Sequence, residues 1–121
     1  MSLRGVYRLK KSYQFNYVYR KGKSIGNDLL VLHYAKNNTG KMKVGFCVSK
    51  KYGKATARNL FKRRMRFAFA CILAETDKGY NYVLAPRTSA AGKSYSALYA
   101  SLTSLIRKAG LISHKNEENR Y

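Results

Sequence analysis

The densest chemical feature of the sequence is a run of cations near its centre. Residues 50–66 read KKYGKATARNLFKRRMR and contain eight Lys or Arg in seventeen positions, with no Asp or Glu. Like charges on one short segment repel each other, so the segment needs a partner of opposite charge to offset that repulsion. Lys and Arg at this density are typical of phosphate contacts. The cluster therefore predicts a polyanionic partner.

The cations fall on a predicted helix whose two sides differ in character. We expect the helix to run from about residue 55 to residue 74. At about 100° per residue, one side is cationic or polar; it carries Arg58, Asn59, Lys62, Arg63 and Arg66. The opposite arc is apolar and is expected to anchor the helix to a core; it holds Ala57, Leu60, Phe61, Met65, Ala68, Cys71 and Ile72. A merely solvated face normally mixes charge signs, so the first side favours phosphate binding.

The whole chain has the same imbalance. Its 121 residues include 25 Lys or Arg against 5 Asp or Glu, giving a formal net charge of +20. Apolar residues make up 45% of the chain, enough for one core. We expect one domain over residues 1–121, with flexible ends at 1–7 and 113–121. This composition favours nucleic-acid binding over a membrane surface, because no 18-residue apolar run is present.

The N-terminal segment and the cysteines bear on the compartment. MSLRGVYRLKK lacks the apolar stretch of a secretory signal, so we expect a cytoplasmic protein. Cys47 and Cys71 stand alone, with no C-x-x-C pair and no neighbouring histidine. We expect buried free thiols in a reducing compartment, in preference to zinc ligands or a disulfide.

The remaining pattern predicts an α+β domain with the element order α-β-β-α-β-α. The expected elements are a helix between Ser12 and Gly22, strands over 28–36 and 41–49, the basic helix, a strand over 80–87, and a helix over 95–109 capped by Ser94. Turn residues at 37–40 suggest that the first two strands form an antiparallel hairpin. We expect the helices to pack against one face of a small sheet.

Two segments resemble a known family. Residues 48–66 follow V-S-K-K-x-G-K-A-x-x-R-N-x-x-K-R-x-x-R, and residues 8–24 follow R-L-K-x-x-x-x-F-x-x-V-[FY]-x-x-G-x-S. These patterns are similar to the signatures of the bacterial ribonuclease P protein component. YVLAPR and the helix after it also resemble that family, so the resemblance covers about residues 6–110.

The resemblance implies a protein subunit that binds a large catalytic RNA and, with it, removes the 5′ leader from precursor tRNA. In that family the RNA carries the active site and holds the Mg²⁺ ions, so no catalytic or metal-ligating residue is expected in this chain. The implied fold is a four-stranded sheet with helices and a left-handed βαβ crossover, like the second domain of ribosomal protein S5. We expect the protein itself to be monomeric.

The resemblance also assigns roles to individual residues. The implied RNA-subunit-binding residues are Lys54, Arg58, Asn59, Lys62, Arg63 and Arg66, and the implied leader-binding residues are Phe15, Tyr19, His33, Lys50 and Lys51. Aromatic and imidazole rings suit the leader because unpaired bases stack on them without demanding a sequence. The residues alone leave core packing open for Phe15 and a structural role open for His33.

Three positions depart from the family pattern. The family commonly has a cation where this chain has Leu60, and Glu or Gln where it has Phe67. Arg64 falls inside the apolar arc, where its stem can lie against the core while its charge reaches water. Arg64 is a candidate replacement for the missing charge.

Other functions fit the sequence less well. Nuclease chemistry within this chain is disfavoured because Mg²⁺ needs clustered carboxylates, whereas the five acidic residues are scattered. A DNA-binding module is disfavoured because the basic helix has no helix-turn-helix partner. A non-enzymatic RNA scaffold, such as a ribosomal protein, stays the alternative on composition and element order alone.

Overall fold

The computed structural model describes residues 7–111. The helices and strands are, in chain order, β1 (Tyr7–Arg8), α1 (Ser12–Lys21), β2 (Lys23–Gly26), β3 (Leu30–Lys36), β4 (Lys43–Phe46), α2 (Ala55–Cys71), β5 (Tyr80–Pro86) and α3 (Tyr95–Lys108). Short 3₁₀ turns η1 (Lys50–Tyr52), η2 (Leu73–Glu75) and η3 (Thr88–Ala90) join them. Tyr7, expected in a flexible end, belongs to β1; residues 1–6 and 113–121 lie outside the described part.

The sheet has five strands in the order β1-β4-β5-β3-β2, and the expected number of four was wrong. Sequence analysis missed the two outer strands, β1 and β2. These strands have only two and four residues, and their side chains are mostly exposed. Neither offers the alternation of apolar and polar residues that identifies a strand in a sequence. Both form only because a longer strand is present to pair with them.

The expected hairpin of residues 28–36 and 41–49 was also wrong. β5 lies between β3 and β4, antiparallel to β3 and parallel to β4. The turn after β3 is bound to the start of β5, because the backbone N–H of Asn37 donates to the Gly79 carbonyl at 2.7 Å. The Asn37 side chain donates to Asn81 at 2.7 Å. β4 and β5 are neighbouring parallel strands joined through α2. They form the βαβ unit for which the family resemblance implies a left-handed crossover.

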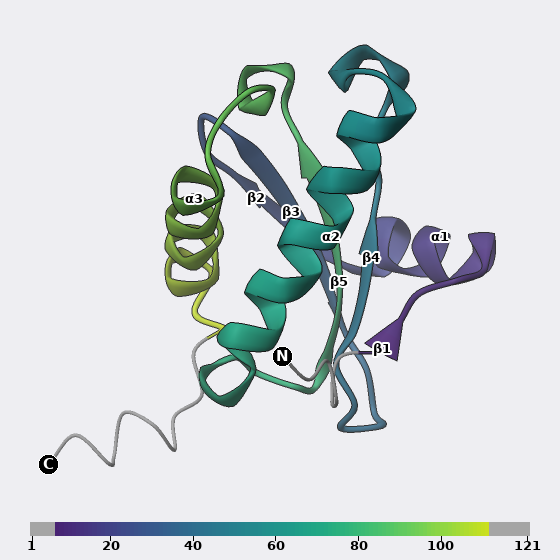
Figure 1. Cartoon of the computed structure of the whole chain (residues 1–121). Coiled ribbons are helices and arrows are strands. Elements are labelled where there is room, and N and C mark those ends of the chain that lie inside the picture. The colour runs from purple at the N-terminus through teal and green to yellow at the C-terminus, as the bar shows by residue number, and fades with distance from the viewer. Residues whose placement is uncertain (1–6, 112–121) are drawn as a thin grey trace, which may run out of the picture.

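Helices cover both faces of the sheet, not one as expected (Figure 1). α2 and α3 pack on one face, where the larger core contains Phe61, Met65, Tyr82 and Leu102. α1 packs on the other face over a smaller core of Leu9, Val18, Ala35 and Val83. The sheet therefore separates α1 from α2.

The apolar underside of α2 holds this helix on the sheet. The buried residues of this segment are Phe61, Met65, Ala68, Phe69 and Ile72. Phe69, which was not expected in the apolar arc, is buried, whereas Cys71, which was expected there, is not. The helix ends at Cys71, before the 3₁₀ turn η2. Cys47 and Cys71 are both exposed, so the expectation of buried thiols was wrong. Cys47 directly follows β4, and Cys71 is the last residue of α2.

Gly45 on β4 allows α1 to lie close to the sheet. A Cβ at this position would be 2.6 Å from Cζ of Phe15 and 3.0 Å from Cβ of Leu9. Such contacts are too short for carbon atoms, so only glycine fits without a shift of Phe15. The missing side chain on β4 therefore sets the position of an aromatic ring on α1.

We expect Gly45→Ala to lower the free energy of unfolding by about 1–3 kcal/mol, because the added methyl overpacks this contact. Thermal unfolding followed by circular dichroism measures the change. Gly92→Ala is the matched control: its φ of +80° strains any side chain, but no atom lies within 4 Å of the new Cβ. Only the Gly45 variant should also displace the Phe15 ring in NMR spectra, and an unmoved ring would contradict the packing described.

Candidate RNA interface

The outer side of α2 presents cations that the described part of the chain does not neutralise. Lys54, Asn59 and Arg63 are exposed, and Arg58, Lys62 and Arg66 are half-buried. Within residues 7–111, the side chains of Arg58, Lys62, Arg63 and Arg66 make no hydrogen bond. No acidic residue occurs between Leu29 and Ala74. The guanidinium and ammonium groups are thus available to an external anion.

A cavity of about 340 Å³ opens at the edge of α2 that faces β1 and α1. Four cations line it together with Phe15, Gly45 and neighbouring apolar residues; the cations are Arg8, Lys10, Lys62 and Arg66. The Arg66 guanidinium lies 5.5 Å from the centre of the Phe46 ring. Burial, and then the nearby charge of Arg8, lower the pKa of Arg66. Because arginine stays charged in proteins, a bound anion would relieve this repulsion.

A second group of side chains lies between α1 and the sheet. His33 on β3 pairs with Val83 on β5, which pairs in turn with Gly45 on β4. Tyr19 on α1 contacts His33 edge-to-face, with ring centroids 5.1 Å apart and an angle of 87° between the planes. Tyr19 is 42% exposed, so part of its ring is open to a ligand. Tyr19 and His33, two of the implied leader-binding residues, are therefore in direct contact.

The electrostatics of this group favour neutral rings. Burial, followed by a hydrogen bond with the Cys47 side chain, raises the pKa of Tyr19 to about 12. Burial lowers the pKa of His33 below its ordinary value of 6.5. At neutral pH both side chains are therefore uncharged. Uncharged rings suit stacking with bases better than they suit binding to phosphate.

The other expected leader-binding residues lie in two places, Phe15 on α1 and the two lysines on η1. Phe15 is half-buried, packs against the smaller core and also lines the 340 Å³ cavity. Its core packing is confirmed, and its contact with the leader stays a prediction. Lys50 and Lys51 are exposed on η1, before α2. Within residues 7–111, no ring contact or hydrogen bond joins either lysine to Phe15, Tyr19 or His33. They follow Cys47 closely along the chain, just beyond this group of rings.

Arg8 and Lys10 had no expected role in RNA binding, and Cys47 was expected only as a buried thiol. Arg8 pairs with Val44 because β1 runs parallel to β4, and this pairing brings Arg8 to the cavity beside Arg66. The only local signal was the position of Arg8 and Lys10 at the start of the family-like segment 8–24. Cys47 lacked any signal, since its neighbour Tyr19 is distant in sequence.

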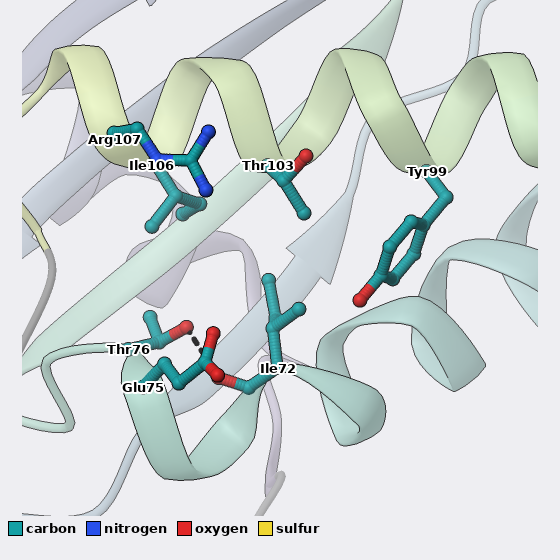
Figure 2. Close-up of a pocket in the computed structure, with 7 residues that line it drawn as sticks. All are labelled: Ile72, Glu75, Thr76, Tyr99, Thr103, Ile106 and Arg107. Carbon is teal, nitrogen blue, oxygen red and sulfur yellow. Dashed lines mark hydrogen bonds between the residues drawn. The ribbon is translucent and has the colours of Figure 1, made fainter. Parts of the chain in front are cut away.

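A smaller cavity of about 190 Å³ lies between the end of α2 and α3 (Figure 2). Glu75 and Arg107 approach it from opposite elements, with Tyr99 and Thr103 beside them. The buried Thr76 hydroxyl donates to the Ile72 carbonyl at 2.7 Å and closes the turn after α2. Glu75 is the one carboxylate lining this cavity. The cavity therefore lacks a pair of carboxylates that could act as general acid and base.

In the stretch from 7 to 111, no three His, Cys, Asp or Glu side chains are grouped as ligands for a metal ion. None of the helices in that same stretch is both long enough and apolar enough to span a bilayer.

One face of the sheet carries a cationic helix, and the other face carries neutral aromatic rings. This combination is typical of a small α+β domain of the RNA-binding class. A family model described as ribonuclease P matches residues 3–110. The chain therefore belongs to the ribonuclease P protein family.

Individual relatives agree with this assignment. The chain is 40% identical over 120 residues to the ribonuclease P protein component of Clostridium beijerinckii, covering 93% of this chain and 94% of that protein. Among solved structures, the RNase P protein of Staphylococcus aureus superposes with a TM-score of 0.80 at 28% identity, over 88% of this chain and 98% of that one. The RNase P protein of Thermotoga maritima gives 0.78 at 28% identity, over 84% and 96%.

The histidine beside Tyr19 provides a test of this geometry. We expect the pKa of His33 to lie below 6.5, because burial disfavours the imidazolium. A depressed folded-state pKa adds stability above the unfolded-state pKa, and this stability is lost as the pH falls through the folded-state pKa. NMR titration measures the pKa, with His33→Gln identifying the resonance.

The His33→Gln variant is also the control for stability. Its thermal midpoint should fall less than that of the parent protein as the pH is lowered from neutral. A His33 pKa at or above 6.5, or equal pH dependence in both proteins, would contradict the partly buried, neutral imidazole.

Proposed function

We propose that this protein is the protein subunit of ribonuclease P, acting with a catalytic RNA to remove the 5′ leader of precursor tRNA. Membership of the family supports this function. The observation that carries the proposal is the 340 Å³ cavity, which is lined by Arg66 of α2 and Phe15 of α1. It joins the cationic face of α2 to the ring-bearing side of the sheet. One protein can therefore contact a folded RNA and an adjoining single strand at once.

In this proposal the cationic side of α2 binds the RNA subunit through Lys54, Arg58, Asn59, Lys62, Arg63 and Arg66. A guanidinium presents a planar pair of N–H groups that matches two phosphate oxygens. Asn59 offers both a donor and an acceptor for a sugar or a base edge. The half-buried Arg58, Lys62 and Arg66 have lost part of their side-chain freedom already, which reduces the entropy lost on binding.

The 5′ leader lies, in the same proposal, along the sheet between α1 and β4. The rings of Tyr19, His33 and Phe15 stack with unpaired bases of the leader. Lys50 and Lys51 attract the phosphates of the leader just beyond these rings. Stacking of this kind tolerates any base sequence. It suits a subunit that must act on many precursors with different leaders.

The Mg²⁺ ions belong, in this proposal, to the RNA subunit. Mg²⁺ prefers carboxylate, phosphate and water oxygens in octahedral geometry. The part of the chain from 7 to 111 does not group its acidic residues into such a site, whereas RNA supplies phosphate oxygens throughout. The protein contributes affinity and substrate selection, and its own residues do not enter the cleavage step.

Reconstitution with a cognate RNA subunit tests the function directly. At low Mg²⁺ concentration, we expect the protein to restore accurate cleavage at the 5′ end of mature tRNA, because its cations offset phosphate repulsion that Mg²⁺ would otherwise screen. The product's 5′ end is mapped by sequencing. An RNA scaffold protein without this role would leave low-Mg²⁺ cleavage at the level of the RNA alone, and that result would overturn the proposal.

The cationic face of α2 is tested by Arg58→Ala/Arg63→Ala. We expect weaker assembly with the RNA subunit, and a slope of log K against log salt that is smaller in magnitude by about 2, since each phosphate contact contributes nearly one unit. Filter binding at several salt concentrations measures both quantities. Arg107→Ala/Lys108→Ala removes the same charge from the exposed last turn of α3 and should retain the parental slope. Equal slopes for all three proteins would place the RNA elsewhere.

The ring-bearing side is tested by Tyr19→Ala. We expect the holoenzyme to bind precursor tRNA about five- to 150-fold more weakly, from the loss of one stacked base, with binding of mature tRNA unchanged. Tyr13→Ala is the matched control, because Tyr13 is 69% exposed on the same helix but lies outside the group of rings. A Tyr19 variant that binds both tRNAs like the parent protein would contradict the leader assignment.

A further inference from the structure

A second hollow lies on the flank of α2 that faces α3. It has a volume of about 300 Å³ and is lined by Arg63, Arg64, Phe67 and Tyr95. We call it the α2–α3 hollow. Lys62 and Arg66 line the other cavity, on the α1 side of the helix. The cationic face of α2 is thus bordered by a hollow on each flank.

The rings of this hollow form a short ladder. The Phe67 and Tyr95 centroids are 5.9 Å apart with an angle of 65° between the planes. Tyr95 and Tyr99 are also 5.9 Å apart, with a smaller angle of 30°. The ladder begins at Phe67, which is 40% exposed. Among residues 7–111, the other exposed large hydrophobic side chains are tyrosines, which have a hydroxyl for water. An exposed phenylalanine beside two other rings suggests a surface that a ligand covers.

The charges around the ladder indicate an anionic ligand. Arg63 is exposed and Arg64 is half-buried at the rim. Neither α2 nor α3 contains an acidic residue. A guanidinium beside aromatic faces can hold a phosphate, or stack on a base itself. A protein segment with an apolar surface would fit the rings but would leave two guanidinium groups without a counter-charge.

We propose that the α2–α3 hollow binds one unpaired nucleotide of the catalytic RNA, its base stacked against Phe67 and Tyr95 and its phosphate held by Arg63 and Arg64. This inference rests on the proposed function, because it takes the RNA subunit as the polyanion on α2. The RNA subunit is favoured over the leader because Tyr19 and His33 lie on the opposite face of the sheet. A volume of about 300 Å³ is at the small end of ligand sites and suits one nucleotide.

Two substitutions at Phe67 separate base stacking from apolar contact. Phe67→Trp keeps an aromatic face and should bind the RNA subunit at least as tightly as the parent protein. Phe67→Leu keeps an apolar surface without a π-face and should bind about five- to 150-fold more weakly, the range for losing one stacked base. Equilibrium binding to the refolded RNA subunit measures both. If Leu binds like Phe, the hollow holds an apolar protein surface or a second copy, and the proposal fails.

Salt dependence distinguishes the rings from the charges. Phe67→Leu should leave the slope of log K against log salt unchanged, whereas Arg64→Ala should reduce its magnitude by about 1. Tyr13→Leu is the matched control for losing an exposed ring elsewhere, and should bind as the parent does. An equal loss in Tyr13→Leu would overturn the assignment, because any exposed ring would then serve. Helical circular dichroism of each variant confirms that the fold is retained.

Crosslinking identifies the strand that occupies the hollow. A photoreactive phenylalanine analogue at position 67, irradiated in the holoenzyme with precursor tRNA, should mark an unpaired nucleotide of the RNA subunit. Crosslinks to the tRNA alone, or to protein, would overturn the proposal. Failure of this inference can be told apart from failure of the proposed RNA face. If Arg58→Ala/Arg63→Ala assembles normally, the RNA subunit does not bind on α2 at all. If that variant assembles weakly but Phe67→Leu assembles normally, the RNA subunit binds on α2 and only the nucleotide in the hollow is refuted.

Discussion

The structure depends on the attachment of a self-repelling helix to an apolar core. Eight cations occur within residues 50–66, and charges so close would favour an extended chain in isolation. Burial of Phe61, Met65, Ala68 and Phe69 against the sheet offsets that repulsion. The two Phe side chains and Met65 each contribute about 1.5–3 kcal/mol when fully buried, and the single methyl group of Ala68 contributes less. The apolar underside thus fixes the direction in which the cations point, and a polyanion then stabilises the arrangement further.

The sheet divides the protein into two chemical surfaces. The larger core lies under α2 and α3, and the smaller core lies under α1. Cations dominate the outer side of α2, and the neutral rings of Tyr19 and His33 lie between α1 and the other face of the sheet. The two surfaces meet at the edge where β1 pairs with β4, because there Arg8 reaches Arg66 and Phe15 fills the space left by Gly45. In the proposed function, a folded RNA and a single strand are therefore bound side by side without competing for the same residues.

Local patterns predicted the longer elements and the cationic side of α2, whereas the family resemblance supplied the candidate leader-binding residues. α2 and α3 lie close to their expected ranges because each has a helical periodicity, and β3 and β5 because each is a short run of apolar and aromatic residues. Ser94 caps α3 as expected by accepting from the Ala97 N–H at 3.2 Å. The hairpin failed because a turn signal reports where the chain bends, not which strand it pairs with. β1 and β2 were missed because their pairing partners, not their own residues, make them strands.

The net charge, the amphipathic character of α2 and the family resemblance can be predicted without the fold, since they depend only on residue types and their spacing along the chain. Tertiary structure alone decided which distant side chains meet. Arg8 reaches Arg66 through parallel strand pairing, Tyr19 reaches His33 and Cys47 through the packing of α1, and Phe67 reaches Tyr95 through the contact of α2 with α3. The physical reason is that strand order and helix placement follow from total burial across the whole chain, which no single segment encodes.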